Sequence, residues 1–400
     1  MSGEFKLVHL DHEREHLTPV EPFGPETGER VNAFHRSFPE YAPTPLVKLD
    51  RLADRLGVKG MFVKDESFRF GLNAFKVLGG SWAVGRCIAQ RLGESIEDLP
   101  CGRLTSPEIR EKLGALTFIT ATDGNHGRGV AWTAARLGQR SVVYMPRGTA
   151  QERLDNIRAL GSDASITDLC YDDAVRLARR MEQEKGYILI QDTAWEGYEE
   201  VPGWIMEGYT TMAKEAVDQL GGVKPTHIFL QAGVGSLAGA LTAYFAALWG
   251  EDRPVITIVE PNSADCIFRT AQANDGQLRF VTEEMDTIMA GLACGEPCTT
   301  AWEILRDHAD NFISMPDRCA ARGMRVLGNP LPGDARIISG ESGASGVGAV
   351  LELLMEPGME AERKRLKLDG DSVVLCFSTE GDTDRENYRK IVWDGAFPNP

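Results

Sequence analysis

The stretch HIFLQAGVGSLAG at residues 227–239 joins a nearly uninterrupted apolar run to a glycine-rich turn and the beginning of a helical pattern. Such an apolar run is typical of a strand that is buried on both faces of a sheet. The glycines let backbone N–H groups approach an anion, and the helix that follows directs its positive end toward it. The stretch therefore predicts a strand, a phosphate-binding loop and a helix, although tight packing between strand and helix also explains the glycines.

The same order of a strand-like run followed by a helical pattern recurs along the chain. The predicted strands are residues 60–63, 116–120, 141–145, 187–190, 227–230, 255–259, 336–338 and 373–377. The predicted helices include residues 129–137, 153–160, 171–185, 204–220 and 347–355. This alternation indicates an α/β fold with an open, mostly parallel sheet. Ligands bind such folds outside the carboxyl ends of the strands, so the loops that follow the strands are the candidate binding segments.

The composition excludes several classes of protein. The 400 residues carry 43 basic and 59 acidic side chains, a net charge of −16, so the chain lacks the basic character that binding to nucleic acid requires. It has no apolar run of the ~18 residues that a membrane helix needs, and its first residues do not resemble a secretion signal. The eight cysteines are dispersed, which favours thiols over disulfides or a metal site. We therefore expect a cytoplasmic protein with no metal, membrane or nucleic-acid partner.

Lys76 is the first candidate for chemistry. It lies in the segment SFRFGLNAFKVLGG, residues 67–80, where apolar residues surround it at the expected beginning of a helix. Burial disfavours the ammonium form of a lysine and favours the free amine, which can form a Schiff base with an aldehyde cofactor. A surface lysine whose stem covers apolar residues explains the same segment, and the local sequence leaves both interpretations open.

Five motifs in a fixed order carry a family resemblance. They are NAFK at residues 73–76 with Gly79 and Gly80, TATDGNHG at 120–127, GVGS at 233–236, SGESGA at 339–344 and FSTEG at 377–381. In this order, over roughly residues 40–390, they resemble the fold-type II pyridoxal-phosphate enzymes, the group of tryptophan synthase β and threonine dehydratase. Within that group the strings NAFK, ATDGNHGRGVAW at 121–132, QDTAWEGY at 191–198 and CFSTEGD at 376–382 are similar to those of the diaminopropionate ammonia-lyases.

The resemblance implies an architecture as well as a chemistry. It implies an α/β fold with two open, twisted, mostly parallel sheets covered by helices, similar to tryptophan synthase β. It also implies a large cofactor-binding domain made of residues 1–83 and 196–400, and a smaller mobile domain made of residues 84–195. A homodimer that acts on a small amino acid is expected.

The resemblance further implies pyridoxal 5'-phosphate as the cofactor and assigns residues to it. Lys76 would hold it covalently, and Asn125 would hydrogen-bond to its phenolic oxygen. Backbone donors of the GVGS motif would bind its phosphate, namely Gly233, Val234, Gly235 and Ser236. Ser378 or Thr379 would face the pyridine nitrogen, which a neutral hydroxyl leaves largely unprotonated. The sequence does not choose between these two neighbours.

Two carboxylates are the candidate catalytic bases. Serine and threonine dehydratases carry a hydroxyl residue, usually serine, at the position of Asp123, and an anion there suits a substrate with a β-ammonium group. Asp192, after the predicted strand 187–190, is a second carboxylate. We expect Asp123 to remove the α-proton of the D isomer, and Asp192, with or without Lys76, to remove that of the L isomer. Thr122, Asp123 and Asp192 are the predicted substrate-binding residues; a helix N-cap for Asp123 and a turn-forming role for Asp192 are the alternatives.

The predicted function is the α,β-elimination of D- or L-2,3-diaminopropionate to pyruvate and two molecules of ammonia. A serine or threonine dehydratase, or a β-replacement synthase of the same fold, is the alternative. A non-catalytic sensor of the same fold is expected to lack Lys76, which is present. Cys266 and Cys294 match positions that can pair in the resembled lyase, and the reducing cytoplasm argues that any such bond is incidental or conditional.

Overall fold

The computed structural model describes residues 4–10, 17–122 and 124–399, and its larger sheet has seven strands. In spatial order these are β1 (Lys6–His9), β10 (Asn311–Met315), β9 (Val255–Pro261), β8 (His227–Gln231), β11 (Val373–Ser378), β3 (Gly60–Asp65) and β2 (Leu46–Lys48). The five central strands pair in parallel, and the edge strands β1 and β2 pair antiparallel to their neighbours.

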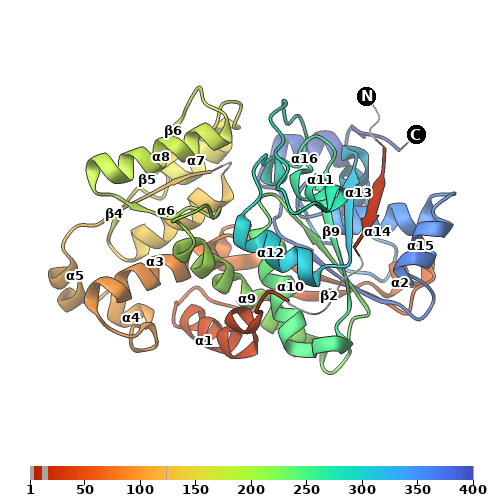
Figure 1. Ribbon diagram of the computed structural model, residues 1–400, viewed down its shortest axis with the longest axis horizontal. Coiled ribbons are helices and arrows are strands. Elements are labelled where there is room, and N and C mark those ends of the chain that lie inside the picture. The colour runs from red at the N-terminus through yellow and green to blue at the C-terminus, as the bar shows by residue number, and fades with distance from the viewer. Residues whose placement is uncertain (1–3, 11–16, 123, 400) are drawn as a thin grey trace.

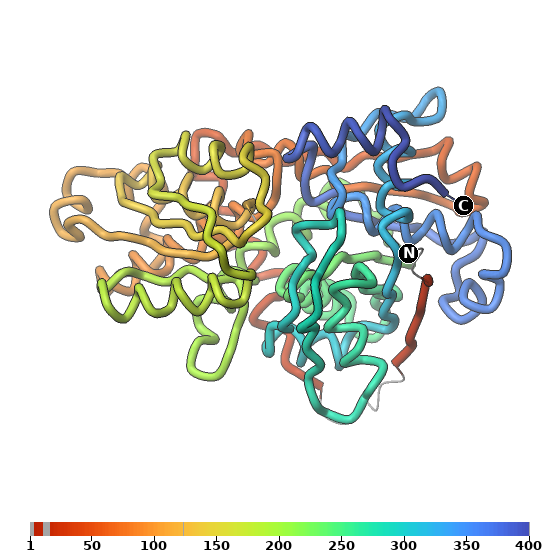
Figure 2. Tube along the Cα trace, turned by 90° about the horizontal axis from the view of Figure 1, so that it is seen from above, coloured from red at the N-terminus to blue at the C-terminus, as the bar shows by residue number. Residues whose placement is uncertain are grey.

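A second, smaller sheet lies beside the first, at the left of Figure 1. Its four parallel strands follow the order β6 (Asp163–Ile166), β5 (Arg140–Met145), β4 (Thr117–Ala121) and β7 (Ile188–Leu189). Viewed from above in Figure 2, the chain around this sheet forms a separate lobe, and the first and last described residues lie on the other lobe. The predicted α/β class with two mostly parallel sheets is confirmed.

Helices cover both sheets. They are α1 (Pro25–Arg36), α2 (Asp50–Leu56), α3 (Val77–Leu92), α4 (Cys101–Leu104), α5 (Pro107–Leu113), α6 (Asn125–Arg136), α7 (Gln151–Arg158), α8 (Tyr171–Lys185), α9 (Glu200–Leu220), α10 (Ser236–Trp249), α11 (Cys266–Ala273), α12 (Thr299–His308), α13 (Asp317–Gly328), α14 (Ser345–Met355), α15 (Glu360–Leu366) and α16 (Arg385–Val392). No helix in the described part of the chain is long and apolar enough to span a membrane.

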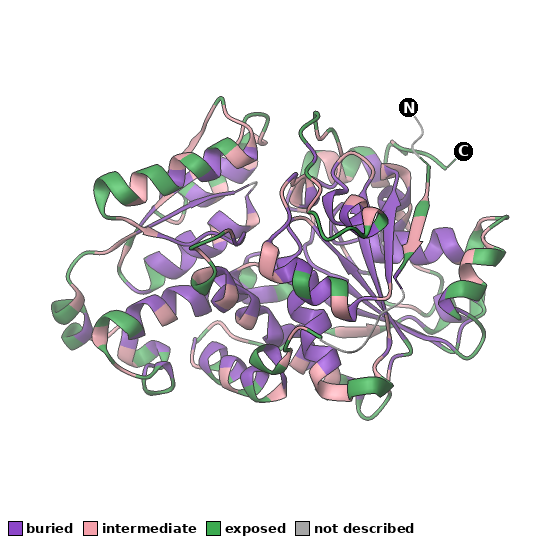
Figure 3. Ribbon diagram, in the orientation of Figure 1, coloured by how far each residue is buried: buried purple, intermediate pink, exposed green. Residues whose placement is uncertain are grey.

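The apolar runs of the sequence become strands that are buried on both faces, as Figure 3 shows for the larger sheet. In β8, Ile228 and Leu230 join the core that contains α9 and α10, whereas Phe229 joins a second core with α13 and α14. Successive side chains of a strand point to opposite faces, so one short apolar run supplies two cores. This is why β8 reads as a continuous apolar segment.

Seven of the predicted strands coincide with strands of the structure, and one prediction is wrong. Residues 336–338 form no regular element. The Ile337 N–H donates to the Leu327 carbonyl at the end of α13, 3.0 Å away, so this segment pairs with a helix end instead of a sheet. The sequence analysis also missed β1, β2, β6 and β10; the first three are short edge strands, whose pairing depends on distant segments. The domain boundaries at 83/84 and 195/196 stay a prediction.

Candidate active site

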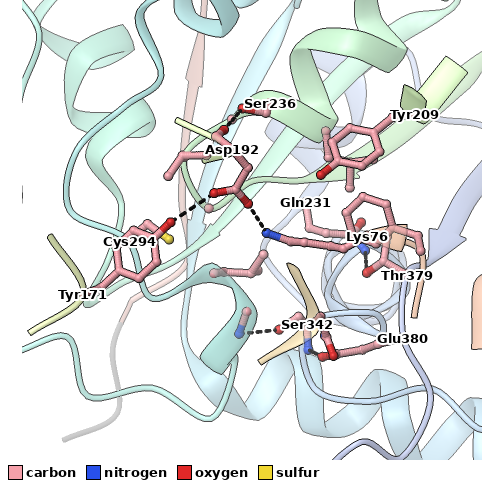
Figure 4. Close-up of a pocket in the computed structure, with 18 residues that line it drawn as sticks. Lys76, Tyr171, Asp192, Tyr209, Gln231, Ser236, Cys294, Ser342, Thr379 and Glu380 are labelled. Carbon is pink, nitrogen blue, oxygen red and sulfur yellow. Dashed lines mark hydrogen bonds and ion pairs between the residues drawn. The ribbon is translucent and has the colours of Figure 1, made fainter. Parts of the chain in front are cut away.

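The carboxyl ends of strands from both sheets meet at one pocket, shown in Figure 4. Its empty volume is about 620 Å³, including the part that opens to solvent. The lining residues are Phe75, Lys76, Asn125, Tyr171, Asp192, Tyr209, Gln231, Gly233, Val234, Gly235, Ser236, Leu237, Gly291, Leu292, Cys294, Ser342, Thr379 and Glu380. Loops that are far apart in the sequence therefore form one site, as the alternation of strands and helices predicts.

Lys76 lies immediately before α3 and is not a surface lysine. Its Nζ donates to Asp192 Oδ2 at 2.6 Å, and its side chain is 17% exposed. The preceding residue, Phe75, is tied to the end of β11 by its N–H, which donates to the Thr379 carbonyl at 3.0 Å. The Phe75 ring also packs on Tyr209 of α9, with ring centroids 4.8 Å apart. These contacts direct Lys76 into the pocket.

A buried ionic cluster holds the segment between β3 and Lys76. Arg69 donates to Glu66 at 2.8 Å and to both carboxylate oxygens of Glu215 in α9 at 2.7 Å. Lys64, in β3, also donates to Glu215 at 2.7 Å. All four side chains are buried. Burial raises the pKa of Glu215, but the two cations more than offset it and lower the pKa to about 2, so this carboxylate is ionised at neutral pH.

Asp192 is a buried carboxylate that joins the two sheets. Its Oδ1 accepts from the Tyr171 hydroxyl at 3.1 Å, and its backbone carbonyl accepts from Ser236 Oγ at 2.6 Å. Burial acts to raise the pKa of Asp192, but the adjacent Lys76 and His126 lower it below its usual range. The side chain therefore stays negatively charged opposite Lys76. A turn-forming role alone does not account for these contacts.

The GVGS motif forms a cradle at the beginning of α10. Gly235 has φ +99°, a conformation that favours glycine, and a Cβ there would lie 2.8 Å from the Ile267 side chain. A Cβ on Gly233 would lie 3.1 Å from the Gly291 carbonyl oxygen. Close packing therefore requires both glycines, and their backbone lines the pocket at the N-terminus of a helix of 14 residues. This arrangement fits a phosphate group.

Of the two candidate partners for a pyridine nitrogen, only one lines the pocket. Thr379 is a lining residue and accepts a hydrogen bond from Gln231 Nε2 at 2.8 Å. Ser378 is the last residue of β11, and its hydroxyl donates to Ser339 Oγ at 2.7 Å, away from the lining. Adjacent residues at a strand end point in opposite directions, so only one of the pair can face a ligand.

Asn125 begins α6 and lines the pocket, where its Nδ2 donates to Glu380 Oε2 at 2.5 Å. Thr122 is buried beside it but does not line the pocket. Its Oγ1 accepts the backbone N–H groups of Gly124 at 2.9 Å and Gly127 at 3.1 Å, so it holds the turn into α6. Asp123, the predicted base for the D isomer, lies outside the described residues.

The sequence analysis assigned no site role to several lining residues, notably Tyr171, Tyr209, Gln231, Ser342 and Glu380. Glu380 follows Thr379 directly, and its position inside the motif FSTEG was the available signal. Tyr171 and Tyr209 begin or lie within helices with apolar patterns, so nothing local separates them from core residues. Cys294 also lines the pocket; the thiol of Cys266 lies 3.7 Å from its carbonyl oxygen, and the two sulfurs are not bonded to each other.

The pocket as a whole fits pyridoxal phosphate. It offers an amine at Lys76, the N-terminus of α10 for a phosphate, and hydrogen-bonding side chains at Asn125 and Thr379. Two buried polar atoms of lining residues, Tyr209 OH and Gln231 Oε1, have no hydrogen-bond partner within the described chain. Buried polar atoms usually have partners, so these two indicate that a polar ligand belongs here.

Comparison with known proteins agrees with this geometry. The family model for pyridoxal-phosphate-dependent enzymes matches residues 38–379. A diaminopropionate ammonia-lyase of Salmonella typhimurium is 53% identical over 372 residues, which is 92% of each chain.

Two solved structures of the Escherichia coli diaminopropionate ammonia-lyase are similar over their whole length. The selenomethionine holoenzyme has a TM-score of 0.93 and 46% identity, and covers 100% of both chains. A complex with an aminoacrylate–PLP azomethine reaction intermediate has a TM-score of 0.90 and 46% identity, with the same coverage. The chain therefore belongs to the pyridoxal-phosphate-dependent enzyme family and, within it, to the diaminopropionate ammonia-lyases.

Proposed function

We propose that this chain catalyses the α,β-elimination of one ammonia from 2,3-diaminopropionate, as the D or L isomer, and that hydrolysis of the resulting aminoacrylate by water gives pyruvate and the second ammonia. The observation that carries the proposal is the pair of Lys76 and buried Asp192, 2.6 Å apart, beside the glycine cradle. An amine, a carboxylate and an anion site are the groups that an amino-acid lyase of this family needs. The relatives described above bear the name of this activity.

Pyridoxal phosphate, when bound, supplies an aldehyde that condenses with amines and a ring that accepts the electron pair released at the substrate's Cα. We assign its covalent attachment to Lys76. Its phosphate is assigned to the backbone of Gly233, Val234, Gly235 and Ser236, its phenolic oxygen to Asn125 and its ring nitrogen to Thr379. Glu380 holds the Asn125 amide in place.

Asp192 is the proposed base for the L isomer. Its carboxylate shares a hydrogen bond with Lys76 Nζ, so a proton can pass between the two groups without a water molecule. Because burial raises the pKa of Asp192 and Lys76 lowers it, displacement of the ammonium makes the carboxylate a stronger base. Asp192 therefore gains basicity when Lys76 is engaged elsewhere.

Asp123 is the proposed base for the D isomer, on the strength of the family resemblance. A carboxylate at this position also suits the β-ammonium group of the substrate. The amide anion NH₂⁻ is not a viable leaving group, so the β-nitrogen has to depart from its protonated form. Negatively charged side chains keep that nitrogen protonated until it leaves.

The decisive experiment compares substrates on the cofactor-loaded protein. Pyruvate release is expected to be much faster from D- and L-2,3-diaminopropionate than from serine or threonine; the reverse order would assign the chain to the dehydratases. Borohydride reduction followed by peptide mapping should label Lys76. Lys76→Arg is the matched control, since it keeps a cation beside Asp192 but cannot be trapped. Label on another residue of the wild-type protein contradicts the assignment.

Three further properties are part of the proposal. We expect a homodimer, a cytoplasmic location and a smaller domain of residues 84–195 that moves relative to the rest. The pocket supports the last point, because Asn125, Tyr171 and Asp192 come from the smaller part and the glycine cradle from the larger. Sedimentation analysis tests the dimer, and hydrogen exchange with and without cofactor tests the motion.

A further inference from the structure

Gln231, at the carboxyl end of β8, makes two hydrogen bonds with the same nitrogen atom. Its Nε2 donates to the Phe377 carbonyl at 2.9 Å and to Thr379 Oγ1 at 2.8 Å. A backbone carbonyl can only accept, so the nitrogen and not the oxygen of the amide has to face it. The orientation of the Gln231 amide is therefore determined by the chain itself.

This orientation decides the direction of the hydrogen bond to Thr379. Both hydrogens of Gln231 Nε2 are used, one by Phe377 and one by Thr379, and the threonine hydroxyl accepts. A hydroxyl has a single hydrogen, and that of Thr379 has no acceptor among the described residues. Thr379 is 3% exposed and lines the pocket, so no group of the described residues competes with a ligand for its hydrogen.

We propose that Gln231 is a positioning residue: its amide nitrogen donates to Thr379 and so leaves the Thr379 hydroxyl as a hydrogen-bond donor toward the cofactor's ring nitrogen, which the family resemblance already implies is unprotonated. The inference rests on the proposed function, because it needs pyridoxal phosphate in this pocket. A pyridinium N–H facing the Thr379 hydroxyl would place two donors against each other. An unprotonated nitrogen has the lone pair that the hydroxyl requires.

Gln231→Glu is the matched perturbation, because it keeps the size and replaces the amide nitrogen by an oxygen. Whether the new carboxyl is ionised or is protonated toward the Phe377 carbonyl, it has no hydrogen left for Thr379. The Thr379 hydroxyl then donates to the carboxyl and turns a lone pair toward the ring nitrogen. The variant should therefore favour the protonated ring.

The measurement is the ¹⁵N chemical shift of the ring nitrogen in protein reconstituted with ¹⁵N-labelled pyridoxal phosphate, without substrate. Free cofactor at low and high pH supplies the protonated and unprotonated references. We expect the unprotonated shift in the wild type and in Thr379→Ser, and a displacement toward the protonated reference in Gln231→Glu. Each pKa unit gained by the nitrogen raises the ratio of its protonated to its unprotonated form about tenfold. In the double variant that combines Gln231→Glu with Thr379→Val, the glutamate should no longer displace the ¹⁵N shift, because residue 379 has no hydroxyl to reorient.

The outcomes separate the two levels of the proposal. Failure of the wild-type protein to bind the cofactor at Lys76 refutes the proposed function. A wild-type protein that binds it with a protonated ring nitrogen refutes the role of Gln231, even if no variant folds. An unchanged shift in a folded Gln231→Glu protein, or an equal displacement with and without the Thr379 hydroxyl, also refutes it.

Discussion

Replacing Asp192 by asparagine keeps the shape of the side chain and removes its charge. In the structure this leaves the Lys76 ammonium without the carboxylate that lies 2.6 Å away. Removing one partner of a buried ion pair lowers the free energy of unfolding by about 3–5 kcal/mol. The Lys76 side chain is 17% exposed, so water recovers part of this energy, and we expect about 3 kcal/mol or less of destabilisation. Loss of a general base lowers the rate by about 10²–10⁴.

The assay is pyruvate release from each isomer of 2,3-diaminopropionate under saturating cofactor. For Asp192→Asn we expect kcat for the L isomer to fall by about 10²–10⁴, and kcat for the D isomer to fall less. Tyr171→Phe is the matched control, since it removes a hydrogen bond of 3.1 Å to the same carboxylate and keeps the charge. A hydrogen bond to a charged group contributes about 1.5–3 kcal/mol, so we expect a loss of roughly 10- to 150-fold from this control, equal on both isomers.

Two results would refute the reasoning. One is an Asp192→Asn protein that binds cofactor normally and keeps its activity on the L isomer. The other is an equal loss on both isomers in a variant whose cofactor spectrum matches the wild type, which would show that Asp192 does not distinguish them. Borohydride trapping at Lys76 in the variant separates a failure of catalysis from a failure of cofactor attachment.

Three other predictions concern neighbouring features. Asp123→Asn should lower kcat for the D isomer more than for the L isomer, and an equal loss would contradict the assigned division. Gly235→Ala should weaken cofactor binding about tenfold or more in a titration, because φ is +99° and the new Cβ would lie 2.8 Å from Ile267. Gly203→Ala in α9 is the control: its new Cβ would have no atom within 4 Å, and cofactor binding should be unchanged. Glu215→Gln should destabilise the fold by about 3–5 kcal/mol at neutral pH. The pKa of Glu215 is lowered to about 2, so its ion pairs stabilise the fold fully above the usual glutamate pKa, and this stabilisation is lost as pH falls toward 2. In urea unfolding, the difference in unfolding free energy between wild type and Glu215→Gln should therefore shrink on acidification.

The motifs that lie within one strand and its following loop could be predicted from the sequence. NAFK, GVGS and QDTAWEGY each carry a residue that the pocket contains, and the strand–loop–helix order places them at one edge. Lys76 was ambiguous because its burial depends on Phe75 packing against Tyr209, a residue more than a hundred positions away. Burial of this kind is a property of the folded chain, and local composition does not reveal it.

The choice between Ser378 and Thr379 illustrates the boundary most clearly. The sequence by itself determined the family, the fold class and the string CFSTEGD that ends the last strand of the larger sheet, and it predicted Lys76 as the attachment residue through the family resemblance. Only the tertiary structure decided which hydroxyl lines the pocket and which side chain hydrogen-bonds to it. Successive side chains of a strand point to opposite sides, and contacts with other parts of the chain decide which side faces the pocket. Here Gln231 of β8 hydrogen-bonds to Thr379, and Ser339 in the loop before α14 hydrogen-bonds to Ser378.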